Sequence, residues 1–328
     1  MIISPAEILK ASSSSGVGVS YWTNFLNCAR KVQLSQEFPS LNQINKQDKL
    51  NMSHVGIFFH KLRELWRLGK IGLMEAEAFT DLINHEPLFI EFGDAFEPAE
   101  WKEACRLFRA YVNGCGVEGE KGYHPGFSLQ EWTTLSCEEP FEFGCRECAQ
   151  RTGKCEERIQ RPLGLYLCPK AFSCAQTFGV PCISGRFDEV CEIFENQREH
   201  LITSRAISIF EPGVYLVDAK TSGQRWGNID VQYDHSLQFA LYQMAWDLKY
   251  PDRPCKGMIA DGVWAYKTAP RFESFLITNT EHKRALVKSY LGKCWQAFLA
   301  NGFGTNPARC FDYGGTCYWL ESGRCDRT

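Results

Sequence analysis

The segment VYLVDAK, residues 214–220, is the feature that most constrains the fold, because it predicts a buried strand that ends in opposite charges. Its run of apolar and β-branched residues is typical of a strand. Side chains two positions apart in a strand point to the same face, so Asp218 and Lys220 are expected to lie side by side. The segment therefore predicts a sheet that presents a carboxylate and an ammonium together at the end of an interior strand.

Periodicity elsewhere predicts an α/β or α+β fold around this strand. Apolar residues at helical spacing predict helices at 21–34, 56–68, 98–113, 235–249 and 280–301. Strand patterns occur at 182–194, 257–267 and 272–279, and the polar segment between 182–194 and 214–220 suits a hairpin loop. Thr280 is a plausible N-cap for the last helix.

The domain prediction is a single domain over residues 1–328 with four parts. A helical N-terminal part covers about 20–115, and a core covers about 183–300. Between them, from about 120 to 182, periodicity fails and glycine, proline, cysteine and charge dominate, which predicts a loop-rich insertion. Residues 301–328 form a glycine- and cysteine-rich tail.

Acidic residues in two of these strands predict a metal site. If 182–194 and 214–220 pair as a hairpin, Asp188 and Asp218 can converge on one divalent cation, with the carbonyl of Ala219 as a further oxygen ligand. Lys220 can polarise a water molecule and stabilise charge that develops on a phosphate. His60, on the early helix, can complete the ligand set. These are the parts needed for metal-assisted hydrolysis of a phosphodiester.

Each of these motifs, taken alone, more often reflects an ordinary ion pair or a polar residue at the end of a strand or on a helix. The order of several motifs along the chain is more specific than any one of them. A G-x-x-x-H motif (Gly56, His60) precedes GRFDEV, VYLVDAKTS and a helix with Q-x-x-x-Y. In this order the motifs resemble the RecB-like branch of the PD-(D/E)XK nucleases, which includes CRISPR-associated RecB-like exonucleases and many phage nucleases. The resemblance covers about residues 20–328, interrupted by the 120–182 region, and implies a restriction-endonuclease-like core with a mixed central sheet flanked by helices.

The same resemblance implies roles for individual residues. His60, Asp188 and Asp218 would bind Mg²⁺ or Mn²⁺, and Lys220 would be the catalytic lysine. Two residues one helical turn apart would contact DNA or support the lysine; they are Gln238 and Tyr242. Asp218 stands where many relatives have glutamate, and either carboxylate can ligate. Glu139 matches an acidic position that some relatives have ahead of the GRFDEV strand.

The function that the resemblance implies is a metal-dependent deoxyribonuclease, acting on DNA ends or single strands. Its partners would be DNA and a helicase, a recombinase or a CRISPR-adaptation protein. An alternative is a non-catalytic nucleic-acid-binding scaffold subunit of a repair, recombination or CRISPR-adaptation complex. A third is a zinc or iron–sulfur protein without the nuclease fold. The net charge of −3 neither supports nor excludes DNA binding.

The chain has 16 cysteines, and their role depends on the compartment. The first residues lack a basic and apolar leader, and no apolar run is long enough to span a bilayer. These features predict a cytoplasmic protein, where thiols stay reduced and clustered cysteines favour metal ligation over disulfides.

The tail cysteines follow a C-x6-C-x7-C pattern at Cys310, Cys317 and Cys325. Iron–sulfur members of the RecB-like branch have one cysteine before the core and three after it, and Cys28 stands at the first position. The resemblance therefore implies a 4Fe–4S cluster on these four thiolates. Zinc ligation and free thiols remain the alternatives.

The insertion carries a second cysteine group. Cys145, Cys148 and Cys155 have C-x2-C-x6-C spacing, and Cys168 is one candidate for a fourth ligand. This spacing predicts a zinc knuckle, with ordinary loop thiols as the alternative. Other candidate fourth ligands are Cys137, Cys174 and Cys182. The remaining cysteines, expected to be small buried hydrophobic residues, are Cys105, Cys115, Cys191, Cys255 and Cys294.

Candidates for contact with nucleic acid outside the metal site are Arg186, Arg225 and Lys267, for phosphates, and Trp226, for base stacking. The alternative, which a single sequence favours, is that they are ordinary surface residues and that Trp226 lies partly in the core.

Overall fold

The computed structural model describes the secondary-structure elements and short flanking segments. The described residues are 19–37, 52–68, 99–114, 132–144, 159–160, 166–167, 177–180, 182–195, 211–222, 233, 236–265, 270–278, 281–300 and 325. The helices are α2 (Val19–Asn27), α3 (Ala29–Glu37), α4 (Met52–Arg67), α7 (Ala99–Gly114), α11 (Leu237–Lys249) and α12 (Glu281–Leu299). The strands are β1 (Thr133–Gly144), β2 (Ile159–Gln160), β3 (Tyr166–Leu167), β4 (Cys182–Ile193), β5 (Gly213–Ser222), β6 (Cys255–Trp264) and β7 (Arg271–Ile277).

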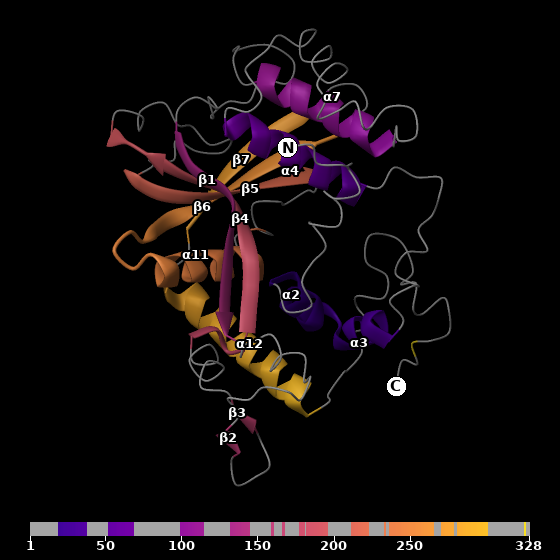
Figure 1. The fold of residues 1–328 in the computed structure, drawn as a ribbon, viewed down its shortest axis with the longest axis vertical. Helices are drawn as coiled ribbons and strands as arrows, with labels where there is room; N and C mark the ends of the chain where they lie inside the picture. The colour runs from indigo at the N-terminus through magenta and orange to yellow at the C-terminus, as the bar shows by residue number, and fades with distance from the viewer. Residues whose placement is uncertain are drawn as a thin grey trace. The chain divides into compact units, whose positions relative to one another are not determined.

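The central sheet has five strands in the order β1-β4-β5-β6-β7 (Figure 1). β4 and β5 are antiparallel, β5 and β6 are parallel, and β6 and β7 are antiparallel. The sheet is therefore mixed, and helices flank it, so the predicted α/β class is confirmed. The predicted pairing of the two acid-bearing strands as antiparallel neighbours is also confirmed.

The chain divides into two compact units. The first contains residues 49–139 and 186–279, which include α4, α7, β5, α11, β6, β7 and most of β1 and β4. The second contains residues 14–48, 140–185 and 280–328. In the second unit, Trp22 of α2 meets Trp295 of α12 edge-on, and its indole Nε1 donates a hydrogen bond to the Cys182 carbonyl at 3.1 Å.

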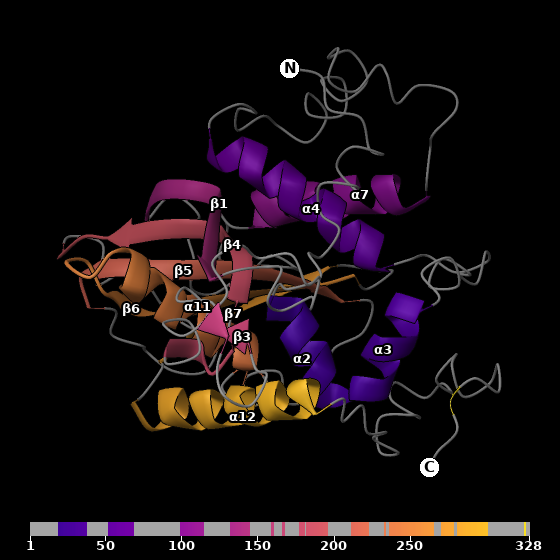
Figure 2. The same cartoon turned by 60° about the horizontal axis from the view of Figure 1, so that its bottom comes forward.

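Strand alternation assigns the side chains of the first unit to two faces of the sheet. Ala219 of β5 and Val263 of β6 belong to a buried cluster formed with the apolar faces of α4 and α7. Residues of the opposite parity, including Asp218 and Lys220, lie on the face that α11 covers, where Gln238 meets both of them. Figure 2 shows α4 and α7 on one side of the sheet and α11 on the other.

A glycine lets α4 come close to β5. A Cβ atom placed on Gly56 would stand 2.7 Å from Oγ1 of Thr221, which is closer than real Cβ contacts. Gly56 precedes His60 by four residues, so both lie on one side of the helix. The small residue of the G-x-x-x-H motif thus brings the helix, and with it the histidine, toward the end of β5.

Two expectations about elements need correction. The predicted helix 21–34 is two helices, α2 and α3, with Cys28 between them. The predicted loop-rich insertion contains β1, a 12-residue strand at the edge of the central sheet, and the short pair β2–β3. Pro140 fits an edge strand, because it cannot donate a hydrogen bond to a neighbour.

Among the described residues, no helix is long and apolar enough to cross a membrane.

Candidate metal centre

Asp188 and Asp218 meet because of the register between β4 and β5. Glu189 pairs with Val217, which places Asp188 opposite Asp218 with both side chains on the α11 face of the sheet. The two carboxyl groups are close enough to share a hydrogen bond. Asp218 is buried, whereas Asp188 is partly exposed. Two acids so close cannot both ionise at low cost without a cation between them.

His60 of α4 joins these acids. Its Nδ1 lies 3.0 Å from Oδ2 of Asp188, and its side chain remains 25% exposed. Burial alone would lower the pKa of His60, but the charge of Asp188 and the hydrogen bond between them raise it. For Asp188, burial alone would raise the pKa, and the same contact with His60 lowers it instead. The histidine is thus held against the acid that the GRFDEV motif contributes.

Glu138 of β1 completes the group, and sequence analysis missed it. One ligand atom each from His60, Glu138 and Asp188 lies within 4.8 Å of the other two. Burial and the neighbouring Asp188 raise the pKa of Glu138 to about 7. The available signal was the alternation of Leu135, Phe141 and Phe143, which indicates a strand around the adjacent glutamates.

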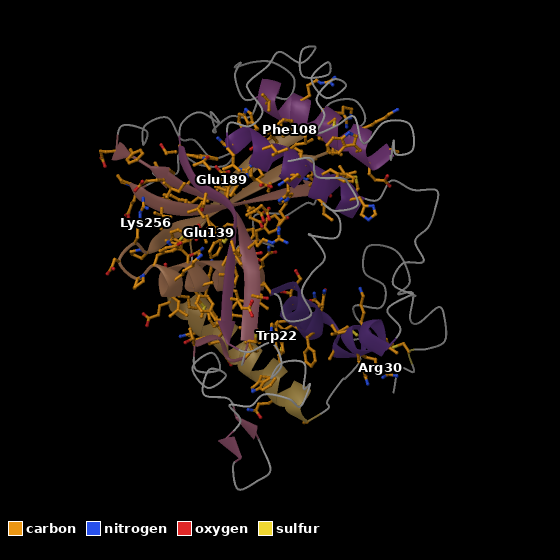
Figure 3. The ribbon with its side chains drawn as sticks, in the orientation of Figure 1. Trp22, Arg30, Phe108, Glu139, Glu189 and Lys256 are labelled. Atoms are coloured by element: carbon orange, nitrogen blue, oxygen red, sulfur yellow. The ribbon has the colours of Figure 1, made fainter. Side chains whose placement is uncertain are left out.

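Glu139, the residue that sequence analysis singled out, lies elsewhere. Its Oε1 accepts hydrogen bonds from Lys249 Nζ and Tyr250 Oη, both at 2.6 Å. These partners stand at the C-terminal end of α11, and Figure 3 labels Glu139 in this region. Within the described residues, Glu138 and not Glu139 belongs to the group of potential metal ligands.

Lys220 and Gln238 surround Asp218. Lys220 Nζ lies 2.6 Å from Oδ2 of Asp218, and Gln238 Nε2 donates to Oδ1 of the same carboxylate at 3.3 Å. Lys220 also donates to Oε1 of Gln238 at 3.5 Å. Burial would lower the pKa of Lys220, but Asp218 and Asp188 raise it, so the lysine is an ammonium. Burial raises the pKa of Asp218 despite this ammonium.

Tyr242 stands one turn after Gln238 on α11. It is buried, and its ring meets Phe187 edge-on at 5.8 Å between centroids. Burial raises the pKa of Tyr242, and a hydrogen bond to Gln238 opposes this effect. The tyrosine therefore stays a neutral phenol, hydrogen-bonded to the Gln238 side chain. These pairwise contacts connect the six predicted residues within the first unit of the chain.

The donor set suits a divalent cation. Carboxylate oxygens are typical ligands of Mg²⁺ and Mn²⁺, whereas an imidazole nitrogen is more typical of transition metals. The group His60, Glu138 and Asp188 offers this combination, with Asp218 adjacent to Asp188. Ala219 is buried between Asp218 and Lys220, and ligation by its carbonyl stays a prediction.

Glu189 follows Asp188 along β4 and points to the opposite face. It forms ion pairs with Arg63 and with Arg67 of α4, the latter at 3.4 Å. Trp132 Nε1 and Thr134 Oγ1 donate to its Oε1 at 2.9 and 2.7 Å. Figure 3 labels Glu189 on the α4 side of the sheet. Within the GRFDEV motif, Asp188 thus faces the candidate metal site, and Glu189 binds the helix that carries His60.

Most of the predicted cysteine ligands lie outside the described residues. These are Cys310 and Cys317 of the tail and Cys145, Cys148, Cys155 and Cys168 of the insertion. Cys28 and Cys325 are described and are both partly exposed. Cys105, Cys191, Cys255 and Cys294 are buried, as predicted for small apolar residues. Of the predicted nucleic-acid contacts, Arg186 is described, and Arg225, Trp226 and Lys267 are not.

Comparisons with known proteins give distant structural similarity and no sequence-family match. No protein-family model and no curated protein matches the chain. Among solved structures, the chain is similar to a protein from Eubacterium rectale described as a "Putative exonuclease", with 12% sequence identity and a TM-score of 0.43. The match covers 95% of this chain and 89% of that one. The case for a function therefore depends on the residues of the site themselves.

Proposed function

We propose that the chain is a divalent-metal-dependent nuclease that hydrolyses phosphodiester bonds in DNA. The observation that carries this proposal is the convergence of His60, Glu138 and Asp188 within 4.8 Å, next to a lysine paired with a buried aspartate. A purely structural ion pair needs neither the histidine nor a third carboxylate. A scaffold subunit would not need several carboxylates gathered in one place, and bringing them together costs free energy.

His60, Glu138 and Asp188 would hold the cation, with Asp218 as a further oxygen ligand. When bound, a Mg²⁺ or Mn²⁺ ion supplies Lewis acidity and lowers the pKa of a water molecule. Burial raises the pKa of Glu138 and of Asp218, and the neighbouring Asp188 raises both further. A divalent cation bound among these carboxylates would offset both effects.

Lys220 would act on the phosphate and on the attacking water. Its ammonium is fixed by Asp218 and by the amide oxygen of Gln238, so it is oriented before substrate arrives. A charge held in this way stabilises developing negative charge on a phosphate more effectively than a mobile one. Gln238 bridges the lysine and the acid, and Tyr242 supports that bridge.

Arg186 would hold the phosphate backbone of the substrate. It lies on the same face of β4 as Asp188, and its side chain is 43% exposed. One of its guanidinium nitrogens lies 3.3 Å from Oε2 of Glu138. A guanidinium at the rim of the site is suited to a phosphate oxygen, because its planar donors match that group.

The direct test is cleavage of end-labelled DNA. Purified protein is incubated with Mn²⁺ or Mg²⁺ and either single- or double-stranded DNA, beside Lys220→Ala and the control Lys256→Ala. Lys256 is a lysine on β6 whose side chain is 43% exposed. We expect the Lys220 variant to lose about a hundredfold or more in rate and the control to match the wild type. Equal rates for wild type and the Lys220 variant would remove the nuclease assignment.

The same assay addresses the substrate and the competing function. We propose that the enzyme acts on DNA ends or on single strands, in partnership with a helicase, recombinase or CRISPR-adaptation protein. Release of label as single nucleotides would support exonuclease action, and internal fragments would contradict it. DNA binding without metal-dependent cleavage would favour a scaffold subunit instead.

Two further metal groups form part of the proposal. The thiolates of Cys28, Cys310, Cys317 and Cys325 would hold a 4Fe–4S cluster, and those of Cys145, Cys148, Cys155 and Cys168 would hold zinc. Cys28, between α2 and α3, and Cys325 are partly exposed, so neither is buried in an apolar core. A cluster of this kind would serve the fold, because nothing in the hydrolysis requires an electron.

A further inference from the structure

Glu138 has an unusual backbone conformation. Its φ is 52°, and it is the non-glycine residue with positive φ in the described part of the chain. A residue with a Cβ atom is disfavoured in this left-handed region and persists there where the surroundings hold it. The strained residue is therefore the one on β1 that belongs to the candidate ligand group.

The left-handed residue changes the direction of the next side chain. In a regular strand, neighbouring side chains point to opposite faces. Here Glu138 reaches Arg186 beside the metal site, and Glu139 reaches Lys249 and Tyr250 of the α11 region. The adjacent glutamates thus reach two different groups of side chains in the first unit, and the left-handed residue stands at the step between them. A local irregularity that re-aims a side chain in this way is a common use of bulges near active sites.

Glu139 is bound more firmly than an ordinary surface glutamate. Its Oε1 accepts from both Lys249 and Tyr250 at 2.6 Å, and its Oε2 accepts from Ser136 Oγ at 2.5 Å. Its side chain is only 17% exposed. These bonds connect the strand on both sides of Glu138 to the end of the helix that supplies Gln238.

We propose that Glu139 is a positioning residue, which anchors β1 to the end of α11 and thereby keeps Glu138 turned into the metal site. Without the anchor, β1 can relax to regular strand geometry, and the Glu138 carboxylate turns away from His60 and Asp188. The inference rests on the proposed function, because it assigns Glu139 a role in metal binding. It requires no contact between Glu139 and the metal.

The test measures Mn²⁺ affinity by titration, with cleavage as a second readout. Glu139→Gln keeps the shape of the side chain and removes its charge, and Tyr250→Phe removes a single hydrogen bond. We expect about tenfold weaker Mn²⁺ binding for Glu139→Gln, with a smaller change in the same direction for Tyr250→Phe. The control, Glu211→Gln, breaks an exposed pair with Lys256 at 3.2 Å and leaves Mn²⁺ affinity unchanged.

A double variant separates positioning from general destabilisation. If Glu139 acts through Glu138, then Glu138→Gln/Glu139→Gln binds Mn²⁺ as weakly as Glu138→Gln alone. Additive losses, or unchanged affinity in Glu139→Gln, would overturn the inference. If the wild-type protein binds no Mn²⁺, the proposed function fails first. If the wild type binds and Glu139→Gln binds equally well, only the positioning role fails.

Discussion

At the residue scale, Glu138 and Glu139 are chemically identical neighbours whose pKa values are shifted in opposite directions. Burial and the nearby Asp188 raise the pKa of Glu138 from its ordinary 4.5 to about 7. For Glu139, burial acts in the same direction, but hydrogen bonds from Lys249, Ser136 and Tyr250 outweigh it and lower the pKa. Ionised Glu138 therefore opposes folding of the metal-free protein, and ionised Glu139 favours it.

This contrast gives a pH-dependent prediction for the metal-free protein. Above about pH 7, Glu138→Gln should raise the melting temperature, because it removes a carboxylate that the fold ionises at a cost. That gain should shrink as the pH falls from about 7 towards 4.5, where the wild-type residue is protonated anyway. Glu139→Gln should lower the melting temperature by a few degrees, since it loses about 1 kcal/mol of charged hydrogen bonding.

Thermal unfolding in EDTA at about pH 8 and about pH 5 measures both effects. In saturating Mn²⁺ Glu138→Gln should lower the melting temperature instead of raising it, because the variant lacks a ligand and the metal stabilises it less. A Glu138→Gln protein that is less stable than wild type in EDTA at the higher pH would contradict the assigned electrostatics.

At the element scale, the position of α4 depends on its closest contact with β5. Replacing glycine by alanine inside a helix normally stabilises it by about 1 kcal/mol. At Gly56 the new Cβ would stand 2.7 Å from Thr221 Oγ1, and such overpacking costs about 1–3 kcal/mol. We therefore expect Gly56→Ala to lose stability and activity, because α4 must move and His60 moves with it.

Removal of the opposing atom should reverse that loss. Gly56→Ala/Thr221→Ala should recover part of the melting temperature and cleavage rate that Gly56→Ala loses. If Gly56→Ala by itself is more stable than wild type and fully active, the close approach of α4 to β5 is not needed for activity. The two single variants and the double variant together measure the coupling.

The same helix is anchored by buried charge. Arg63 pairs with Glu189 and lies 3.8 Å from Asp261, while Tyr111 of α7 donates a hydrogen bond to Asp261. Burial would lower the pKa of Arg63, but Glu189, Tyr111 and Asp261 raise it, so the guanidinium is charged. Burial would raise the pKa of Glu189, and Arg63 and Arg67 lower it instead.

Removal of one partner from this network should strongly reduce the free energy of unfolding. Arg63→Met leaves Glu189 buried without its main cation, and we expect a loss of about 3–5 kcal/mol in the free energy of unfolding. Lys61→Met is the matched control on the same helix, because Lys61 forms a partly exposed i,i+3 pair with Glu64. That control should lose about 0.5 kcal/mol or less. Urea denaturation measures both, and similar losses for the two variants would contradict the anchoring role.

At the scale of the whole molecule, the cysteines are proposed to link the start of the chain to its end. A cluster on Cys28 and the three tail cysteines would close a loop that contains most of the chain, and such closure stabilises a fold by restricting the unfolded state. Protein purified without oxygen should be brown and absorb near about 400 nm, and Cys28→Ser should lose that colour. A colourless protein that contains zinc would favour zinc ligation instead.

Local sequence patterns were sufficient for much of this protein. Strand-forming residue patterns in 182–194 and 214–220, the second a continuous apolar and β-branched run, predicted β4 and β5. The spacing of Asp218 and Lys220 predicted their shared face. The helical spacing of Gln238 and Tyr242 placed both on one side of α11. These predictions succeed because strand and helix periodicity depends on neighbours a few residues apart.

Tertiary structure decided which glutamate joins Asp188 and the histidine. Glu138 joins His60 and Asp188 because β1 pairs with β4, which follows it by some 40 residues, and because one strained residue redirects the chain. The partnership of Arg63 with Glu189 likewise depends on where α4 packs on the sheet. Local patterns assign a side chain to a face, but the pairing of distant segments follows from packing of the whole core, and that packing placed Glu138 in the site and Glu139 outside it.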